Sequence, residues 1–203
     1  GRQQGGAELG GDGAGGQVTF TYTTGATISG TLFEDEGATA ITPTHTIKMA
    51  LSTTGVPVIY STTTDPGTGT FHFDVGTTGY TATSSFTLWV DASSTKATRV
   101  VGIGAIPAYS GMDLYQDRVI VDMDSNRGGV GLEDFIIYDA TNDTDIMFDA
   151  ATTTNPGLTV NAGLELYVTA DTSLMICGDL TLNGNAAASP DGDLQLLDSS
   201  SLI

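Results

Sequence analysis

Apolar and polar residues alternate with a period of two along much of this chain. Clear runs begin at Val18, Phe71 and Leu164, and in each of them a Thr, Tyr, His, Asp or Glu separates one apolar residue from the next. Successive side chains of a β-strand point to opposite faces of its sheet, so each run predicts a strand with one face toward a core. The sequence therefore predicts an all-β protein.

The first half of the chain predicts a β-sandwich, over residues 17–105. The expected strands are 18–23, 27–34, 46–52, 56–61, 68–75, 85–91 and 98–103. Short segments rich in Gly, Pro and Asp separate them, and seven short strands at this spacing are typical of an Ig-like sandwich. Residues 1–16, GRQQGGAELGGDGAGG, have almost nothing to bury and are expected to form a flexible Gly-rich arm.

The pattern changes in the second half. Between Leu158 and Leu182 short apolar strands alternate with turns, as they do in the successive coils of a β-solenoid. One such coil cannot cover its own apolar face, so neighbouring coils have to stack. We therefore expect residues 106–203 to form a solenoid-like unit or a second small β domain.

Two stretches of the first half resemble a known module. Residues 28–37 read ISGTLFEDEG, and residues 64–73 read TDPGTGTFHF. This strand, turn and hairpin resemble the carboxypeptidase-regulatory-like, or prealbumin-like, module over about residues 26–104. The resemblance implies a non-catalytic β-sandwich of a secreted protein. The second half resembles segments of long bacterial repeat proteins, and the whole chain resembles subunits of extracellular bacterial filaments.

The charge of the chain restricts its partners. Its 24 acidic residues against 6 Lys and Arg give a formal net charge of -18. Such a balance opposes contact with nucleic acid or with an anionic lipid surface, and no apolar run is long enough for a membrane span. The low Lys and high Thr and Gly content, together with a start at Gly1 that fits a processed form, favours an extracellular or cell-surface location in a prokaryote.

The sequence predicts no enzyme and no required cofactor. It lacks the G-x-S-x-G and H-E-x-x-H motifs, and its two histidines, His45 and His72, lie far apart in sequence. His72 falls on the outward positions of its run and is expected in solvent. The single cysteine, Cys177, follows an apolar run and is expected to be a small buried residue.

Acidic turns offer oxygen ligands for calcium. Asp122, Asp124 and Asn126 fit part of an EF-hand loop, but Arg127 stands where that loop needs Gly, so an EF-hand is excluded. A different calcium loop and a solvated acidic turn both stay open. The candidate ligands are Asp122, Asp124, Asn126, Asp139, Asp143 and Asp145. Asn142 also begins a glycosylation sequon, N-D-T.

Trp89 falls on the polar positions of its run. The inward positions there are Phe86, Leu88 and Val90. Trp89 is therefore expected on the outer face of the sandwich. An aromatic residue at such a place indicates a packing surface for the second domain or for another subunit, an isolated exposed side chain, or a sugar platform.

Two segments are expected to lack partners within one chain, namely the run after the Gly-rich arm and the C-terminal run 193–203. An unpaired strand edge is a template for a neighbour's strand, and a contact that does not close builds a fibre. The sequence therefore predicts a secreted structural subunit that polymerises head to tail by strand donation into a surface filament. The alternative is a monomeric adhesin or carbohydrate-binding module. The residues expected at the contacts are Val18, Phe20, Tyr22, Trp89, Leu194 and Leu196.

Overall fold

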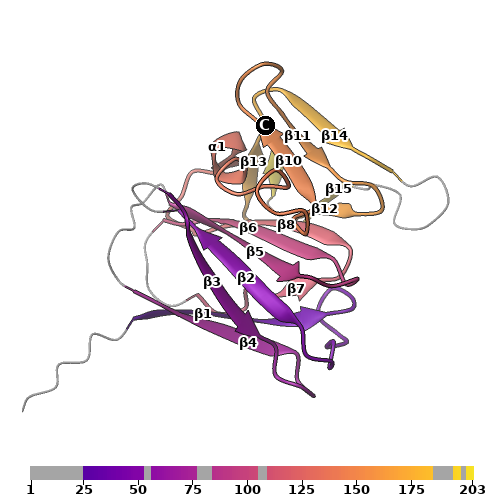
Figure 1. The fold of residues 1–203 in the computed structure, drawn as a ribbon. Helices are drawn as coiled ribbons and strands as arrows, with labels where there is room; N and C mark the ends of the chain where they lie inside the picture. The colour runs from indigo at the N-terminus through magenta and orange to yellow at the C-terminus, as the bar shows by residue number, and fades with distance from the viewer. Residues whose placement is uncertain (1–24, 53–55, 77–83, 105–108, 185–193, 198–199) are drawn as a thin grey trace, which may run out of the picture.

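The computed structural model describes residues 25–52, 56–76, 84–104, 109–184, 194–197 and 200–203 (Figure 1). These residues are nearly all in strands and turns, which confirms the all-β prediction. The one helix among them is α1 (Leu132–Phe135), a single turn that the sequence analysis missed. No helix in the described ranges is long and apolar enough to cross a membrane.

The first half forms a sandwich of two sheets. Its strands are β1 (Ala26–Phe33), β2 (Thr46–Leu51), β3 (Val58–Thr63), β4 (Thr70–Val75), β5 (Ser85–Asp91) and β6 (Ala97–Gly102). These are six of the seven predicted strands, with ends within two residues of those expected, and the seventh, 18–23, lies outside the described residues. The smaller sheet has the order β4-β1-β7, where β7 is Leu114–Tyr115.

The larger sheet joins the two halves of the chain. It has seven strands in the order β15-β12-β8-β6-β5-β2-β3, in which β8 is Arg118–Met123, β12 is Glu165–Val168 and β15 is Leu194–Leu196. β6 and β8 pair in parallel from Ala97 and Arg118 to Gly102 and Met123. The predicted boundary between residues 105 and 106 therefore lies between two strands that are neighbours in one sheet.

A hydrophobic core lies on each face of this seven-stranded sheet. Phe86, Leu88 and Val90 of β5 belong to the core of the sandwich, between the two sheets. Trp89, on the opposite face, belongs to a second core together with Phe135 and many aliphatic residues of the second half. The strict alternation along β5 thus lets one strand contribute to both cores.

The second half coils into a stack of parallel strands. Its further strands are β9 (Val130–Gly131), β10 (Phe148–Ala151), β11 (Gly157–Val160), β13 (Ser173–Met175), β14 (Asp179–Leu182) and β16 (Ser201–Leu202). β14 pairs in parallel with β11, β15 with β12, and β16 with β13. We call β11 to β16 the parallel stack. Among the described residues it has two turns, β11 to β13 and β14 to β16, and its strands β12 and β15 belong to the larger sheet.

Candidate functional site

Rows of apolar side chains run through the parallel stack from one turn to the next, and three of the rows begin on β8 or β9, which pair with the stack. The rows are Val119, Leu166 and Leu194; Val121, Val168 and Leu196; Val130, Leu174 and Leu202; Leu158 and Leu180; and Val160 and Leu182. Each row is fully buried until its last member. That last member is always a leucine and is always at least partly exposed, reaching 44% for Leu196 and 42% for Leu202.

We call the five terminal leucines, Leu180, Leu182, Leu194, Leu196 and Leu202, the leucine end. β14, β15 and β16 are each the outermost strand of their sheets in the described part of the chain. β14 pairs only with β11, β15 only with β12 and β16 only with β13 among the described residues, so each of the three strands has one edge without a described partner. The leucine end therefore combines an apolar surface with strand edges that have no partner in the described ranges, the two features of a strand-docking site.

Few charges protect the leucine end. β15 reads Leu-Gln-Leu and β16 reads Ser-Leu, so neither strand carries a charged residue, although the whole chain has a net charge of -18. Soluble proteins usually block an exposed strand edge with a charge, a proline or a bulge. Of the three strands only β14 carries a charge, at the exposed Asp179 with which it begins, and Ile203 adds a further apolar side chain, 72% exposed, directly after β16.

Positive charges gather instead where the two halves meet. The structure describes five of the six Lys and Arg residues, namely Lys48, Lys96, Arg99, Arg118 and Arg127. Each of the five bonds from one half of the chain to the other, so we call them the ionic seam. Arg99 of β6, for example, pairs with Asp122 of β8, and Arg118 of β8 pairs with Glu36 at 2.8 Å.

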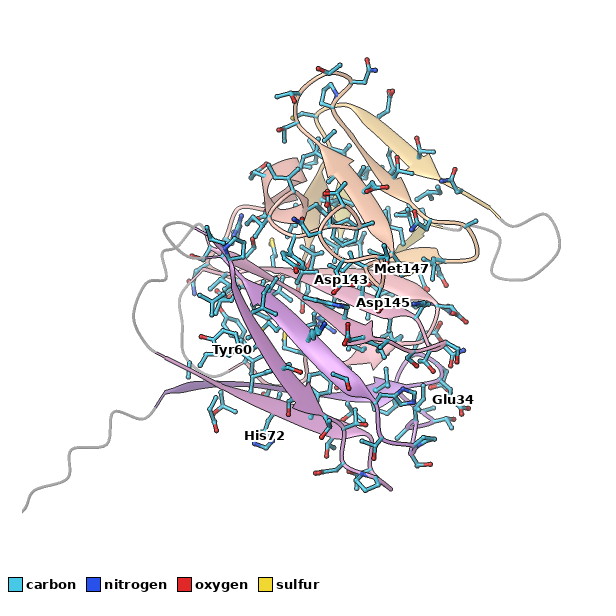
Figure 2. The ribbon with its side chains drawn as sticks, viewed as in Figure 1. Glu34, Tyr60, His72, Asp143, Asp145 and Met147 are labelled. Carbon is cyan, nitrogen blue, oxygen red and sulfur yellow. The ribbon has the colours of Figure 1, made fainter. Side chains whose placement is uncertain are left out.

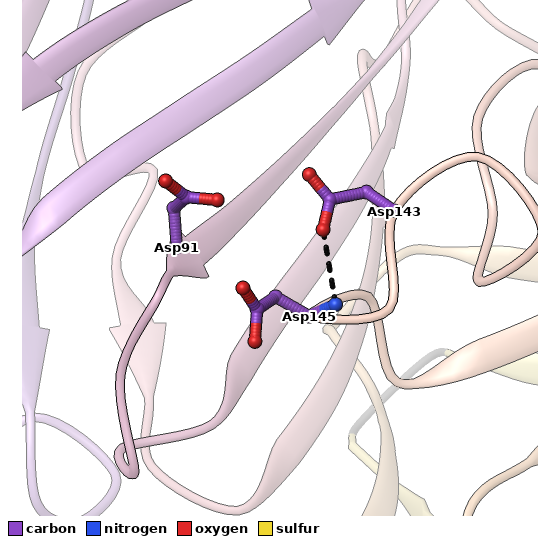
Figure 3. A group of neighbouring side chains, drawn as sticks. All are labelled: Asp91, Asp143 and Asp145. Atoms are coloured by element: carbon purple, nitrogen blue, oxygen red, sulfur yellow. Dashed lines mark hydrogen bonds between the residues drawn. The ribbon is translucent and has the colours of Figure 1, made fainter.

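Three aspartates beside Lys48 and Lys96 of the ionic seam lie close together (Figure 3). Asp91, Asp143 and Asp145 have oxygen atoms within 4.8 Å of one another. The ammonium group of Lys48 lies 2.7 Å from Asp91 and 3.7 Å from Asp143, and Lys96 pairs with Asp145. Two lysines thus supply positive charge at this cluster.

Hydrogen bonds within the cluster hold its geometry. The amide of Asp145 donates to Asp143 Oδ1 over 3.0 Å, as Figure 3 shows, and the amide of Ala92 donates to Asp145 Oδ2 over 2.7 Å. Partial burial alone would raise the pKa of Asp145, but Lys96 and the Ala92 amide outweigh it and leave the pKa below its ordinary value. The hydrogen bond from Lys48 to Asp91 likewise raises the pKa of Lys48.

The other predicted calcium ligands do not converge on one point. Asp122 accepts hydrogen bonds from Arg99 and Thr169, and Asp124 accepts them from Tyr109 and Asn126. Asp139 accepts hydrogen bonds from Thr141 and Ala150. These carboxylates hold turns and strands together, and calcium binding stays a prediction.

A buried ion pair fixes helix α1 to the sandwich. Asp134 is 1% exposed, pairs with Arg127, and accepts a hydrogen bond from the Gly131 amide over 2.9 Å. Burial raises the pKa of Asp134, while the Gly131 amide and the Arg127 charge act in the opposite direction. Arg127 also donates to the carbonyl oxygens of Ser84 and Gly129, so its guanidinium joins the two halves.

Trp89 lies on the face that the alternation predicts, and it is fully buried there. Its ring stacks on Tyr138 of the second half, with centroids 5.2 Å apart and an interplanar angle of 25°. The indole therefore packs against the second half of its own chain. A sugar platform at Trp89 is excluded, because a ring with no exposed surface cannot contact a sugar.

The remaining predicted residues have mixed outcomes. His72 is exposed, as expected (Figure 2). Cys177 is also exposed, so the prediction of a buried cysteine is wrong. β13 ends at Met175, and Cys177 lies in the following bend, where the alternation no longer directs side chains inward. Asn142 is exposed in its turn, and its glycosylation stays a prediction. Val18, Phe20 and Tyr22 lie outside the described residues.

A cavity of about 410 Å³ lies beside helix α1 and the bend that holds Cys177. Its lining consists of Gly131, Leu132, Glu133, Thr152, Pro156, Met175 and Cys177. A thiol nucleophile needs a neighbouring base, and this lining includes no histidine, lysine or arginine. The cavity therefore offers no recognisable catalytic arrangement.

Sequence reasoning found two residues of the leucine end, Leu194 and Leu196, and missed the other three. Their shared signal is an apolar residue at the same place in successive turns. Loops of unequal length separate these turns, so the period is not visible in the sequence. In comparisons with known proteins, no family model, no curated protein and no solved structure matches the chain.

Proposed function

We propose that this chain is a structural subunit that self-associates end to end into an extracellular filament. The observation that carries the proposal is the leucine end, where five apolar rows reach the surface beside three strands that have no outer partner among the described residues. Free edges pair readily with strands of other chains, and alternate side chains give such pairing its register. A contact between different surfaces of two copies leaves each copy able to bind another, which builds a fibre.

The charge distribution supports self-association at this end in particular. A net charge of -18 opposes contact between copies over most surfaces, since like charges repel. β15 and β16 carry no charge themselves, so contact along these two strands places no like charges directly opposite each other. Five described cations are engaged in the ionic seam and are not available to bind an anionic ligand on the surface.

The architecture agrees with a structural role. Two cores share one sheet, and ion pairs tie the two halves together, which makes the subunit stiff. The resemblance of residues 26–104 to the prealbumin-like module, whose members are usually non-catalytic modules of secreted proteins, points in the same direction. The alternative of a monomeric adhesin or carbohydrate-binding module relied on Trp89 or on the acidic turns as its binding site, and the burial of Trp89 removes the first of these two supports.

Sedimentation velocity and electron microscopy of the purified full chain test the proposal. The wild-type chain is expected to form large particles that grow with protein concentration and that are seen as fibres. Leu196→Lys places a charge on the leucine end and is expected to leave monomers. The matched control is Ile136→Lys, because Ile136 is similarly exposed at 39% but lies at the end of helix α1 and on no strand edge.

The control variant is expected to assemble like the wild type. Wild-type protein that stays monodisperse and monomeric over the whole concentration range contradicts the proposed function. Equal assembly of wild type and Leu196→Lys contradicts the assignment of the leucine end as the contact.

A further inference from the structure

We infer that the strand that docks on the leucine end is the segment 18–23 of a second copy, added to the free edge of β15. The inference rests on the proposed function and names the partner of the same site. It depends on three observations: the residue pattern of the segment, its point of attachment, and the character of the other free edge of the larger sheet.

The pattern of the segment continues the rows of the stack. β15 presents Leu194 and Leu196 toward the core, with Gln195 between them. A strand added to β15 needs the same order of an apolar, a polar and an apolar residue to extend the two rows. Residues 18–23 read VTFTYT and repeat that order, with Val18, Phe20 and Tyr22 on one face and threonine on the other.

The charge of the segment also fits. No charged residue occurs from Gly13 to Phe33, so the segment brings no negative charge to a molecule that already carries many. Docking of an acidic strand would add repulsion at the uncharged edge of β15. The segment and β15 are thus both uncharged and both apolar on one face, and a neutral segment adds no repulsion to Asp193 and Asp198, which flank β15 in the sequence.

The attachment of the segment excludes docking on its own chain. Only Thr24 and Gly25 separate it from Ala26, where β1 begins, so the end of the segment lies within roughly 11 Å of Ala26. In Figure 1 the start of β1 lies at the far left of the sandwich, whereas β14 and β15 lie at the upper right. The segment of one copy therefore meets the leucine end of another copy, and the two copies join head to tail.

β3, the opposite edge of the seven-stranded sheet, fits the segment less well. Val58 and Ile59 are adjacent in sequence, are each 43% exposed, and point to opposite faces of the sheet. Such an edge has no single apolar face and therefore specifies no register. It provides a matched site for a control, since Val58 is as exposed as Leu196.

Cross-linking between copies tests the inference. Cys177→Ser first removes the native thiol, and two single-cysteine proteins are then made: Phe20→Cys with an affinity tag, and Leu196→Cys without one. They are mixed before assembly and treated with a short bis-maleimide. A covalent tagged–untagged dimer is expected from this pair, and none from Phe20→Cys mixed with Val58→Cys. A dimer in the control mixture alone assigns the segment to β3 and overturns the inference.

Charge substitutions in the full chain provide a second readout that does not depend on cross-linking. Phe20→Asp combined with Tyr22→Asp places two charges on the apolar face, and is expected to abolish assembly. Thr21→Asp combined with Thr23→Asp adds the same charge to the other face, and is expected to retain it. Circular dichroism checks that both proteins are folded.

The outcomes separate the inference from the function on which it rests. Absence of assembly in the wild type means that the proposed function fails. A different result is that the wild type assembles, that the protein with Phe20→Asp and Tyr22→Asp assembles fully, and that no cross-link forms between positions 20 and 196. This result means that the chain polymerises through another segment. In that case only the inference is overturned.

Discussion

The two halves of this molecule share the same alternation of apolar and polar residues, but their strands pair differently. In the sandwich, strands close in sequence pair antiparallel, as β2 does with β3, and the apolar faces of two sheets cover each other. In the parallel stack each strand pairs with one a full turn away, and the outermost described turn, β14 to β16, is paired on one side only. Within the described residues the sandwich core is thus covered by both of its sheets, whereas the second core reaches the surface at the leucine end.

The halves also share more than a covalent link. One sheet passes through both, Trp89 joins the second core from a strand of the sandwich, and the ionic seam crosses the junction. We therefore expect the two halves to unfold in one cooperative transition.

The largest effect is expected from Trp89→Ala. Truncating a fully buried tryptophan costs about 4 kcal/mol of unfolding free energy, because a large apolar surface and its packing are lost. Since the sheet is shared, calorimetry should show one transition for both halves, at a lower temperature than in the wild type. Phe73→Ala, in the sandwich core, should lower the same single transition. Two separate transitions, of which only one moves, would show that the halves are independent.

The next effect concerns the buried pair of Arg127 and Asp134. Arg127→Ala leaves a buried carboxylate without its partner, and should cost about 3 kcal/mol in chemical denaturation. Arg127→Met with Asp134→Leu removes both charges and should cost clearly less. A double variant as unstable as the single one would contradict this account of the pair.

The pH dependence of the stability of Arg127→Ala tests whether the buried carboxylate of Asp134 causes the loss. Burial raises the folded-state pKa of Asp134 above its unfolded value, so the folded protein binds the proton more tightly. The contribution of Asp134 to the stability of the variant should therefore be fully present below the unfolded pKa, and should be lost as pH rises through the folded pKa. Denaturation curves between pH 4 and pH 8 measure this, and a flat profile would exclude a buried carboxylate as the cause.

A smaller effect is expected from Lys96→Met in the ionic seam. The folded-state pKa of Asp145 is lowered, so its stabilising contribution is present above the unfolded pKa and is lost as pH falls through the folded pKa. The pair is partly exposed, and the substitution should cost no more than about 1 kcal/mol at neutral pH. The difference from the wild type should vanish in acid, where Asp145 is protonated; a difference that persists there would have a cause other than the ion pair.

The smallest effect on stability is expected at the leucine end itself. Leu196→Lys should change the unfolding free energy of the monomer by no more than about 0.5 kcal/mol, because the side chain is exposed. Leu166→Ala, which is buried in the turn below, should cost about 3 kcal/mol. Denaturation at a protein concentration too low for assembly compares the two, and a large loss from Leu196→Lys would mean that this residue belongs to the closed core.

The sequence predicted local features well and long-range ones poorly. Strands β1 to β6 and the outward face for Trp89 follow from alternation within a single run. The approach of Lys48 and Lys96 to the aspartates near residue 145 depends on how loops cross the junction, which no local pattern records. Helix α1 has one turn, too short to show a helical period, and Cys177 lies just past a strand whose end the pattern does not mark.

Hydrogen exchange of the assembled and the monomeric protein tests the central claim most directly. If the leucine end receives a strand, the amides of β15 and β16 should exchange more slowly in the assembly than in the Leu196→Lys monomer, since edge groups become paired or covered. The amides of β3, on the opposite edge, should exchange at the same rate in both. Unchanged exchange at β15 and β16, or protection that arises at β3 instead, would contradict the account.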